Sequence, residues 1–129
     1  MFQNLEIFRL AQGMAEHAAS RQSVVAGNIA NADTPGYRQR DIPDFAEIWR
    51  NDTSGIGMRR TRDSHLSQAP GSERARSFAV SDAPADPNGN TVSLETEIIK
   101  SAEIRQQHEI ALSIYRSGLS VLRTSLGRR

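Results

Sequence analysis

Histidines and carboxylates are the side chains in this sequence that could act as catalytic groups or metal ligands. The three histidines are His17, His65 and His108, and a zinc hydrolase helix would need a second histidine four residues after the first. Leu112 stands at that position after His108, so the motif is incomplete. The chain has no cysteine, so it has neither a thiol nucleophile nor a thiolate zinc site. These patterns predict a protein that is not an enzyme and that uses no catalytic residue, metal or cofactor.

One run of oxygen-bearing side chains imitates a calcium-binding loop. Asp86, Asn88 and Asn90 occupy its first, third and fifth positions, and Glu97 occupies its twelfth. The sixth position needs glycine for a sharp turn and holds Thr91 instead. A calcium-binding module therefore stays only as an alternative, against the simpler interpretation of a turn followed by a helix start.

Length, charge and hydropathy favour an elongated protein that is completed by partners. A chain of 129 residues fits one domain, and its net charge of +1 does not favour nucleic acid or anionic lipid. With 37% hydrophobic and 5% aromatic residues, the chain has a low hydrophobic content for a compact globular domain of this length. No apolar run approaches the roughly 20 residues of a membrane span, and the first residues lack the basic region of a secretory signal. We expect any export to use another route.

Two long segments at the ends of the chain have the apolar spacing of amphipathic helices. The first runs from Leu5 to Ala32 and the second from Leu94 to about Leu126. Each is longer than a usual globular helix and carries an apolar stripe, so each is expected to be the partner of the other within the subunit. The predicted seam consists of Ile7, Met14, Val25, Ile98, Leu112, Tyr115, Leu119 and Leu122.

The segment between the two helices has a different character. It is rich in proline, glycine, serine and aspartate, and we expect a short helical turn at Phe45–Trp49 and a β-hairpin around Ile56–Leu66. So few apolar residues cannot build a second core. The fold is therefore predicted to be mainly α, with a helical domain formed by residues 1–37 plus 91–129 and an irregular, partly β segment at residues 38–90.

The first helix is expected to end in a rigid elbow. Asn31 can adopt a left-handed cap, and Pro35 biases Thr34 away from helical geometry. Pro35-Gly36 then suits the centre of a type II turn, with glycine where a positive φ is needed.

An elbow alone does not need an asparagine on the apolar stripe or a tyrosine directly after the glycine. Such polar seam residues set register and partner choice, and tyrosine is common at interfaces. A subunit contact and a purely internal role both remain open. The residues assigned to the elbow and to subunit contacts are Asn28, Ile29, Asn31, Thr34, Pro35, Gly36 and Tyr37.

The run NIANADTPGYRQRDIPDF closely resembles the N-terminal signature of bacterial flagellar axial proteins of the rod and hook family. In that family, Asn-Ile-Ala-Asn-x-x-Thr-Pro-Gly-Tyr closes the first helix. Within the family, the chain most resembles the proximal rod members. It shares their short length and the run Gly89-Asn90-x-Val92-x-Leu94-Glu95-x-Glu97. Of the two proximal siblings, FlgC is the less favoured because of the Arg-Asp-Ile-Pro continuation. Ser93 and Ile98-Ile99-Lys100 depart from the family pattern and leave the helix stripe intact.

The resemblance implies a structural subunit of the basal-body rod. The two end helices would pair as an antiparallel coiled coil and polymerise into the axial tube that transmits torque and carries the export channel. The implied partners are further copies of the chain, the rod proteins FlgC and FlgF, the adaptor FliE, the MS ring and the flagellar export gate. The implied location is the periplasmic rod, reached by type III export without a cleaved signal peptide. A stand-alone helical adaptor or chaperone would share the hairpin and stays as the alternative.

Overall fold

The computed structural model describes residues 2–53, 78–80 and 84–127. The two end helices have 29 and 33 residues, so the prediction of a mainly α fold is confirmed. The first begins before the expected Leu5 and ends before the expected Ala32, whereas the second has the expected bounds. In chain order the elements are α1 (Phe2–Ala30), β1 (Arg40–Asp41), α2 (Phe45–Thr53), β2 (Phe78–Ala79) and α3 (Leu94–Leu126).

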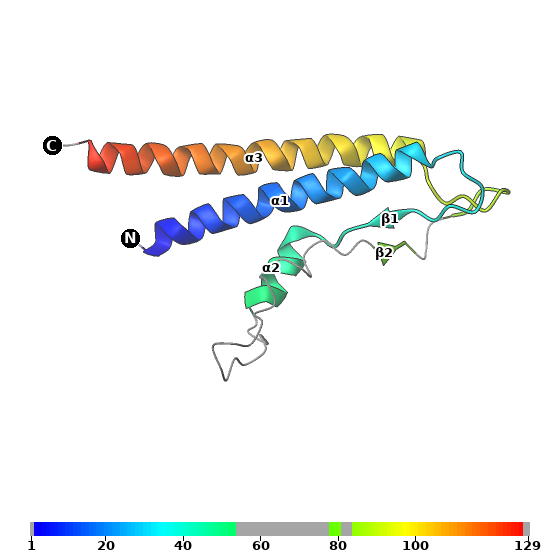
Figure 1. Ribbon diagram of the computed structural model, residues 1–129, viewed down its shortest axis with the longest axis horizontal. Coiled ribbons are helices and arrows are strands. Elements are labelled where there is room, and N and C mark those ends of the chain that lie inside the picture. The colour runs from blue at the N-terminus through cyan, green and yellow to red at the C-terminus, as the bar shows by residue number, and fades with distance from the viewer. Residues whose placement is uncertain (1, 54–77, 81–83, 128–129) are drawn as a thin grey trace, which may run out of the picture.

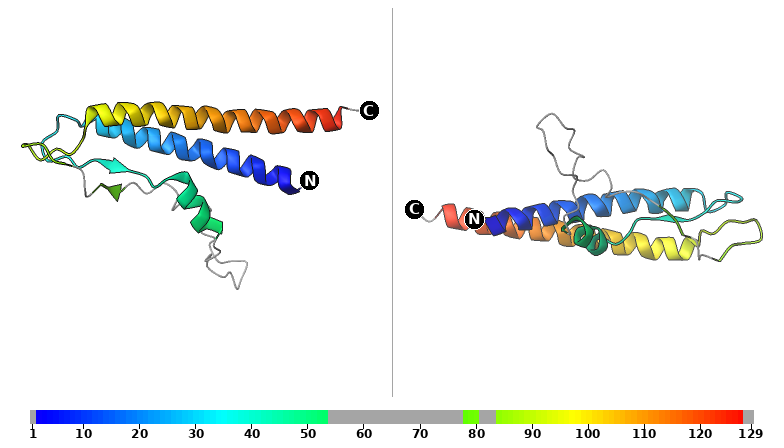
Figure 2. Two further views of the ribbon diagram at one scale, coloured as in Figure 1. Left: turned by 180° about the vertical axis from the view of Figure 1, so that it is seen from behind. Right: turned by 90° about the horizontal axis from the view of Figure 1, so that it is seen from below.

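The long helices α1 and α3 lie side by side and run in opposite directions, so both chain ends lie at the same end of the pair (Figure 1). The two helix axes are not parallel, and in the view of Figure 1 they diverge toward the termini. After α1 the chain turns back along the pair through β1 to α2, which lies on the side of α1 away from α3 (Figure 2). The result is an elongated hairpin with β1 and α2 lying along one flank.

The buried seam between α1 and α3 is narrow and contains several small residues. A buried position every seven residues on each helix is the spacing of a coiled coil, and alanine allows the two backbones to approach closely. On α1 the buried positions with this spacing are Ala11, Ala18 and Val25. On α3 they are Glu97, Ile104 and Ala111.

The face that α3 turns toward α1 differs from the predicted seam by one residue. Ile98 was expected to face α1 but is 57% exposed, and the preceding residue Glu97 is buried in its place. Leu112 is likewise exposed next to the buried Ala111. The shift has a physical cause, because Glu97 finds buried hydrogen-bond partners and Ala111 permits a closer helix approach than leucine does. Of the other predicted seam residues, Val25 is buried, Met14, Leu119 and Leu122 are half-buried, and Ile7 and Tyr115 are exposed.

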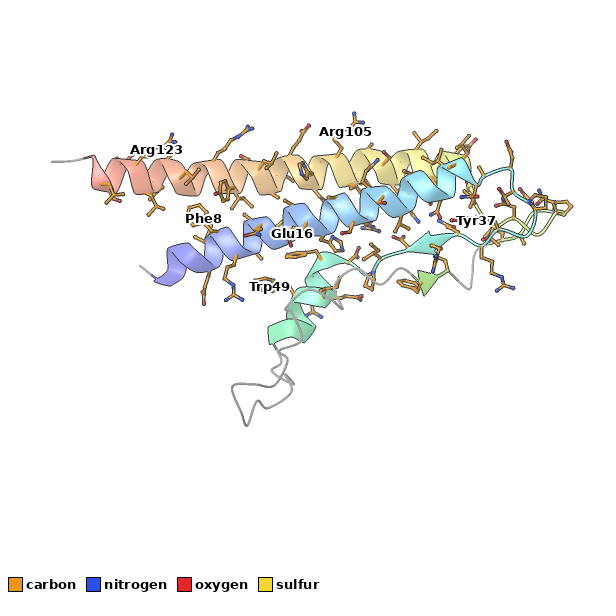
Figure 3. The ribbon with its side chains drawn as sticks, viewed as in Figure 1. Phe8, Glu16, Tyr37, Trp49, Arg105 and Arg123 are labelled. Atoms are coloured by element: carbon orange, nitrogen blue, oxygen red, sulfur yellow. The ribbon has the colours of Figure 1, made fainter. Side chains whose placement is uncertain are left out.

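An aromatic contact joins the two helices near their far ends. Phe8 lies between α1 and α3 (Figure 3), with its ring centroid 5.2 Å from that of Tyr115 in an edge-to-face arrangement. A Cβ added to Gly118 would lie 3.0 Å from Phe8 Cζ, so the glycine makes room for this ring. Tyr115 therefore contributes to the helix pair despite its exposure.

The short helix α2 packs on α1 through aromatic side chains. The Phe45 ring lies 5.7 Å from the ring of His17 on α1 and 5.7 Å from the ring of Trp49. A Cβ on Gly13 would lie 3.4 Å from Phe45 Cε2, so α1 and α2 are in close contact. The helical turn expected at Phe45–Trp49 is thus present and extends to Thr53.

The strands β1 and β2 form a small antiparallel ladder in which Arg40 pairs with Ala79 and Asp41 with Phe78. The hairpin expected around Ile56–Leu66 lies outside the described residues, and the predicted domain bounds stay a prediction. None of the described helices combines the length and apolar character needed to cross a membrane.

Candidate functional site

The elbow after α1 is closed by backbone bonds and by the side chain of Asn31. The Asn31 N–H donates to the Gly27 carbonyl oxygen at 3.2 Å, and its Nδ2 donates to the same oxygen at 2.8 Å. Its Oδ1 accepts a bond from Thr34 Oγ1 at 3.2 Å. Every non-glycine residue among those described has a negative φ, so the left-handed cap expected at Asn31 is wrong. The side chain ends the helix by bonding back to it instead.

The turn that follows the helix is confirmed at Pro35-Gly36. The Tyr37 N–H donates to the Thr34 carbonyl oxygen at 3.2 Å, and Gly36 has a φ of +72°. A bond across four residues with positive φ at the third is the pattern of a type II turn. The Gly36 N–H also donates to the Asn88 carbonyl oxygen at 3.0 Å, which ties the elbow to the segment before α3.

A side chain from that distant segment binds the backbone of the elbow after α1. The buried Asn90 donates from Nδ2 to the carbonyl oxygens of Asn31 (2.9 Å), Ala32 (2.8 Å) and Thr34 (2.9 Å). Its Oδ1 accepts a bond from the Val92 N–H at 2.7 Å. These carbonyl groups belong to the turn that follows α1, so one amide from residue 90 satisfies the backbone of the elbow and fixes the approach to α3.

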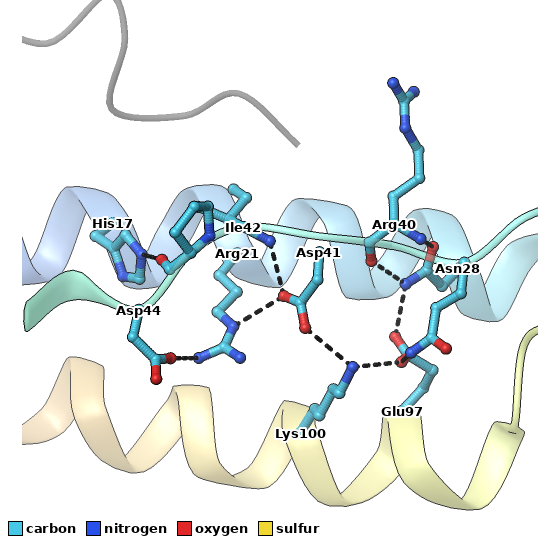
Figure 4. Close-up of polar contacts among 11 residues, drawn as sticks. His17, Arg21, Asn28, Arg40, Asp41, Ile42, Asp44, Glu97 and Lys100 are labelled. Atoms are coloured by element: carbon cyan, nitrogen blue, oxygen red, sulfur yellow. Dashed lines mark hydrogen bonds and ion pairs between the residues drawn. The ribbon is translucent and has the colours of Figure 1, made fainter. Parts of the chain in front are cut away.

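The side-chain amide of Asn28 uses its full bonding capacity inside the subunit. Nδ2 donates to the Arg40 carbonyl oxygen (2.7 Å) and to Glu97 Oε2 (2.9 Å). Oδ1 accepts from the Arg40 N–H (3.1 Å) and from the Tyr37 hydroxyl (3.3 Å). The residue is 0% exposed, so the subunit contact expected of it is replaced by an internal role. Asn28 joins α1 to β1 and α3 at one point (Figure 4).

Glu97 is the second centre of this polar cluster. Its carboxylate is 0% exposed and accepts bonds from Asn28 on α1 and from Gln39 Nε2 at 2.6 Å. Lys100 Nζ lies 3.3 Å from Glu97 Oε1. A buried carboxylate without partners would be strongly destabilising, and here its two oxygens are both satisfied.

Asp41 continues the cluster along the hairpin. Lys100 Nζ on α3 donates to Asp41 Oδ2 at 3.0 Å, and Arg21 Nε on α1 donates to Oδ1 at 3.1 Å (Figure 4). Burial raises the pKa of Asp41, but hydrogen bonds from Arg21, Lys100 and the Ile42 N–H, with the charge of Arg21, outweigh burial and hold that pKa below its ordinary value of 3.8. The carboxylate therefore links both long helices to β1 as an anion.

The remaining elbow residues differ in exposure. Thr34, Pro35 and Gly36 lie on the surface, and Ile29 is partly exposed. Asn31 and Tyr37 are half-buried. Because these side chains can still be reached from outside, a contribution of this exposed part of the elbow to subunit contacts stays a prediction.

The residues of the calcium-like loop are engaged in other ways. Asn90 binds the elbow after α1, and Glu97 belongs to the buried cluster. Within the described residues, no group of three or more histidine, aspartate or glutamate side chains is placed to hold a metal ion. His17, one of the candidate catalytic groups, is buried, and its Nε2 donates to the Pro43 carbonyl oxygen at 2.8 Å. These side chains hold the fold together, and the calcium-binding alternative is not supported.

Comparison with known proteins places this architecture in a family. The family model described as "Flagella basal body rod protein" matches residues 8–38, which contain most of α1 and the elbow. The flagellar basal body rod protein FlgB of Agrobacterium fabrum is 36% identical over 89% of this chain and 88% of its own length. The chain belongs to the FlgB family of flagellar basal body rod proteins. The FlgB proteins of Salmonella typhimurium and Escherichia coli are 33% and 35% identical, over 86% and 81% of this chain and the same shares of their own lengths.

Membership in the FlgB family confirms the resemblance drawn from the signature run and favours this family over its sibling FlgC. Sequence reasoning assigned no role in the elbow to Gln39, Asp41, Asn90, Glu97 or Lys100. One signal was available, because an asparagine on the apolar stripe of one helix requires a polar partner. Glu97 is the polar residue with heptad spacing to Ile104 and Ala111, and it provides that partner.

Proposed function

We propose that this chain polymerises with copies of itself and with related rod proteins into the proximal part of the flagellar axial tube, which transmits torque and encloses the export channel. The observation that carries the proposal is the FlgB family match over most of the chain together with the antiparallel hairpin. A long hairpin held rigid at its elbow is suited to a load-bearing wall. In this role the chain does no chemistry of its own.

Exposed aliphatic side chains support an assembling role. Residues such as Ile98 and Leu126 on α3 are mostly exposed, while the buried seam relies on small residues such as Ala11 and Ala111. A helix pair with a thin core and exposed aliphatic residues gains stability when neighbours cover it. A chain that must pass unfolded through a narrow channel would benefit from such marginal stability before assembly.

The proposal also names the location of the chain and its partners. We assign the chain to the periplasmic rod, reached by type III export without a cleaved signal peptide. Its neighbours there are FlgC, FlgF, the adaptor FliE, the MS ring and the export gate. The hairpin domain of residues 1–37 plus 91–129 forms the tube wall, and β1 and α2 cover its flank.

The test is deletion of the encoding gene in the source organism, followed by complementation with a tagged copy. We expect loss of motility and of assembled rods, restoration by the tagged chain, and recovery of that chain in purified basal bodies. A motile deletion strain, or a tagged chain found only outside basal bodies, would contradict the proposal. A stand-alone adaptor would instead be a fully helical, cooperatively melting monomer in dilute solution.

A further inference from the structure

A line of exposed aliphatic residues runs along α3 on a face that the hairpin does not use. Ile99, Ile110 and Val121 are 61%, 45% and 58% exposed. They follow one another at steps of eleven residues, which equal three helical turns plus about 20° and so keep all three on one side of the helix. We call these three residues the outer stripe.

A second apolar feature lies on a different side of α3. Ile29 at the end of α1 and Ile98 on α3 line an open groove of about 260 Å³ together with Ser101, Ala102 and Arg105. We call these five residues the apolar groove. At about 100° per residue, Ile98 and Ile99 point in different directions, so one copy can present its stripe and its groove at the same time.

The charges beside the two surfaces have opposite signs. Glu103 lies between Ile99 and Ile110 in sequence and within about 40° of both around the helix. Arg105 lines the groove and projects outward from α3 (Figure 3). Both residues are exposed, and no ion pair or hydrogen bond involves either side chain in the part of the chain that the structure describes.

We propose that the outer stripe of one copy packs into the apolar groove of a second copy, with the two α3 helices parallel and Glu103 of one copy facing Arg105 of the other. In that register each stripe residue lies opposite the residue two positions later on its neighbour. Ile99 then enters the centre of the groove at Ser101, and Ile110 meets the exposed Leu112. The proposal rests on the proposed function and adds the contact surface and the partner.

The geometry determines what kind of assembly results. Stripe and groove are different surfaces, so the contact is heterologous and leaves a free stripe at one end and a free groove at the other. Such contacts continue into rings or helical arrays and do not close as a two-fold dimer. A wall of parallel hairpins follows from repeating this one contact.

Cysteine cross-linking tests the contact directly, because the chain has no cysteine of its own. Two differently tagged copies, one with Ile99→Cys and one with Ala102→Cys, are expressed together in the source organism lacking its own gene. After oxidation of purified basal bodies, we expect a disulfide between the two tags. Neither variant alone should cross-link, and Ser23→Cys on α1 paired with Ala102→Cys serves as the negative control.

Charge reversal gives a second, independent measurement. Glu103→Arg and Arg105→Glu should each lower incorporation into basal bodies about tenfold, because each places like charges face to face. The double variant should return to within about twofold of the original chain. Both positions are exposed, and far-UV circular dichroism of the purified variants should show unchanged helicity.

The outcomes separate this inference from the proposed function. If the tagged chain is recovered in basal bodies but the two cysteines do not cross-link, the contact is wrong and the rod function stands. A symmetric link between two copies of Ile99→Cys, a link to another protein, or a failure of the double charge variant to recover would also overturn the contact. Absence of the chain from basal bodies would contradict the function, and a tag-to-tag disulfide in the concentrated purified chain would then still support the contact.

Discussion

Asn28 on α1 donates a hydrogen bond of 2.9 Å to the carboxylate of Glu97 on α3, in a place where neither side chain is exposed. The same amide pairs with both backbone groups of Arg40, and the same carboxylate accepts a bond from Gln39. One contact thus holds the two long helices and the returning segment in a single register. Buried polar pairs of this kind set register because every alternative alignment leaves them unsatisfied.

Asn28→Ala should therefore destabilise the hairpin by about 2–4 kcal/mol, since it removes the hydrogen bond to Glu97 Oε2 and both bonds to the Arg40 backbone in a buried place. The measurement is urea unfolding of the purified chain in a fixed concentration of a stabilising osmolyte. Far-UV circular dichroism monitors the loss of helix. Gln106→Ala, on an exposed surface of α3, should change the free energy of unfolding by less than about 0.5 kcal/mol. Equal effects of the two substitutions would show that the cluster does not hold the register.

The pH dependence of stability should reflect Asp41. Its pKa is lowered in the folded chain, so its ion pairs stabilise the fold above the ordinary value of 3.8 and are lost as the pH falls through the lower folded value. Acidification from about pH 6 to pH 3 should then cost the original chain more stability than it costs Asp41→Asn.

Asp44 provides the matched control for that experiment. It also pairs with Arg21, at 3.2 Å, but its side chain is 72% exposed. Solvent screens such a pair, so Asp44→Asn should keep nearly the whole acid sensitivity of the original chain. If Asp41→Asn and the original chain lose stability in parallel on acidification, another group is responsible.

The two long helices, with the bounds of α3, could be predicted from sequence because they depend on local spacing. Apolar and small residues at steps of three and four define the helices, and Pro35-Gly36 defines the turn. These features need no knowledge of distant segments. The prediction therefore succeeded for helices, for the elbow turn and for the family.

The rotation of α3 and the polar cluster could not be predicted in this way. A hydrophobic stripe places Ile98 in the seam and Glu97 in solvent, whereas the structure does the reverse. The partners of Glu97 are 69 residues away at Asn28 and 58 residues away at Gln39. Local periodicity cannot predict the burial of a residue whose partners are so distant in sequence. For the same reason it could not predict the hydrogen bonds from Asn90 to the elbow.

Asn90→Asp tests the N–H donors of the Asn90 side chain separately from its acceptor oxygen. The aspartate keeps an oxygen for the Val92 N–H but replaces the donor with a negative oxygen facing three carbonyl groups. We expect it to destabilise the fold more than Asn90→Ala, which should cost about 1–3 kcal/mol. Thermal melts monitored by circular dichroism, in the same stabilising osmolyte as the urea experiment, would rank the two variants. An aspartate variant as stable as the original chain would exclude this role of the amide donors.

Two glycines near the elbow give opposite predictions for the same substitution. A Cβ would meet nothing within 4 Å at either Gly27 or Gly36, so crowding does not contribute at either site. Gly27 lies inside α1, where alanine should stabilise the helix by about 0.5–1 kcal/mol. Gly36 has a φ of +72°, a conformation that costs alanine about 1–2 kcal/mol.

The experiment compares Gly27→Ala and Gly36→Ala with the original chain in urea unfolding and in recovery from basal bodies. The first variant should unfold at a higher urea concentration and assemble normally. The second should unfold at a lower concentration and assemble poorly, because the turn sets the direction in which the chain leaves α1 and places Arg40 against Asn28. If Gly36→Ala unfolded and assembled like the original chain, the positive φ would not matter for the elbow, and the turn would be a flexible link between α1 and β1.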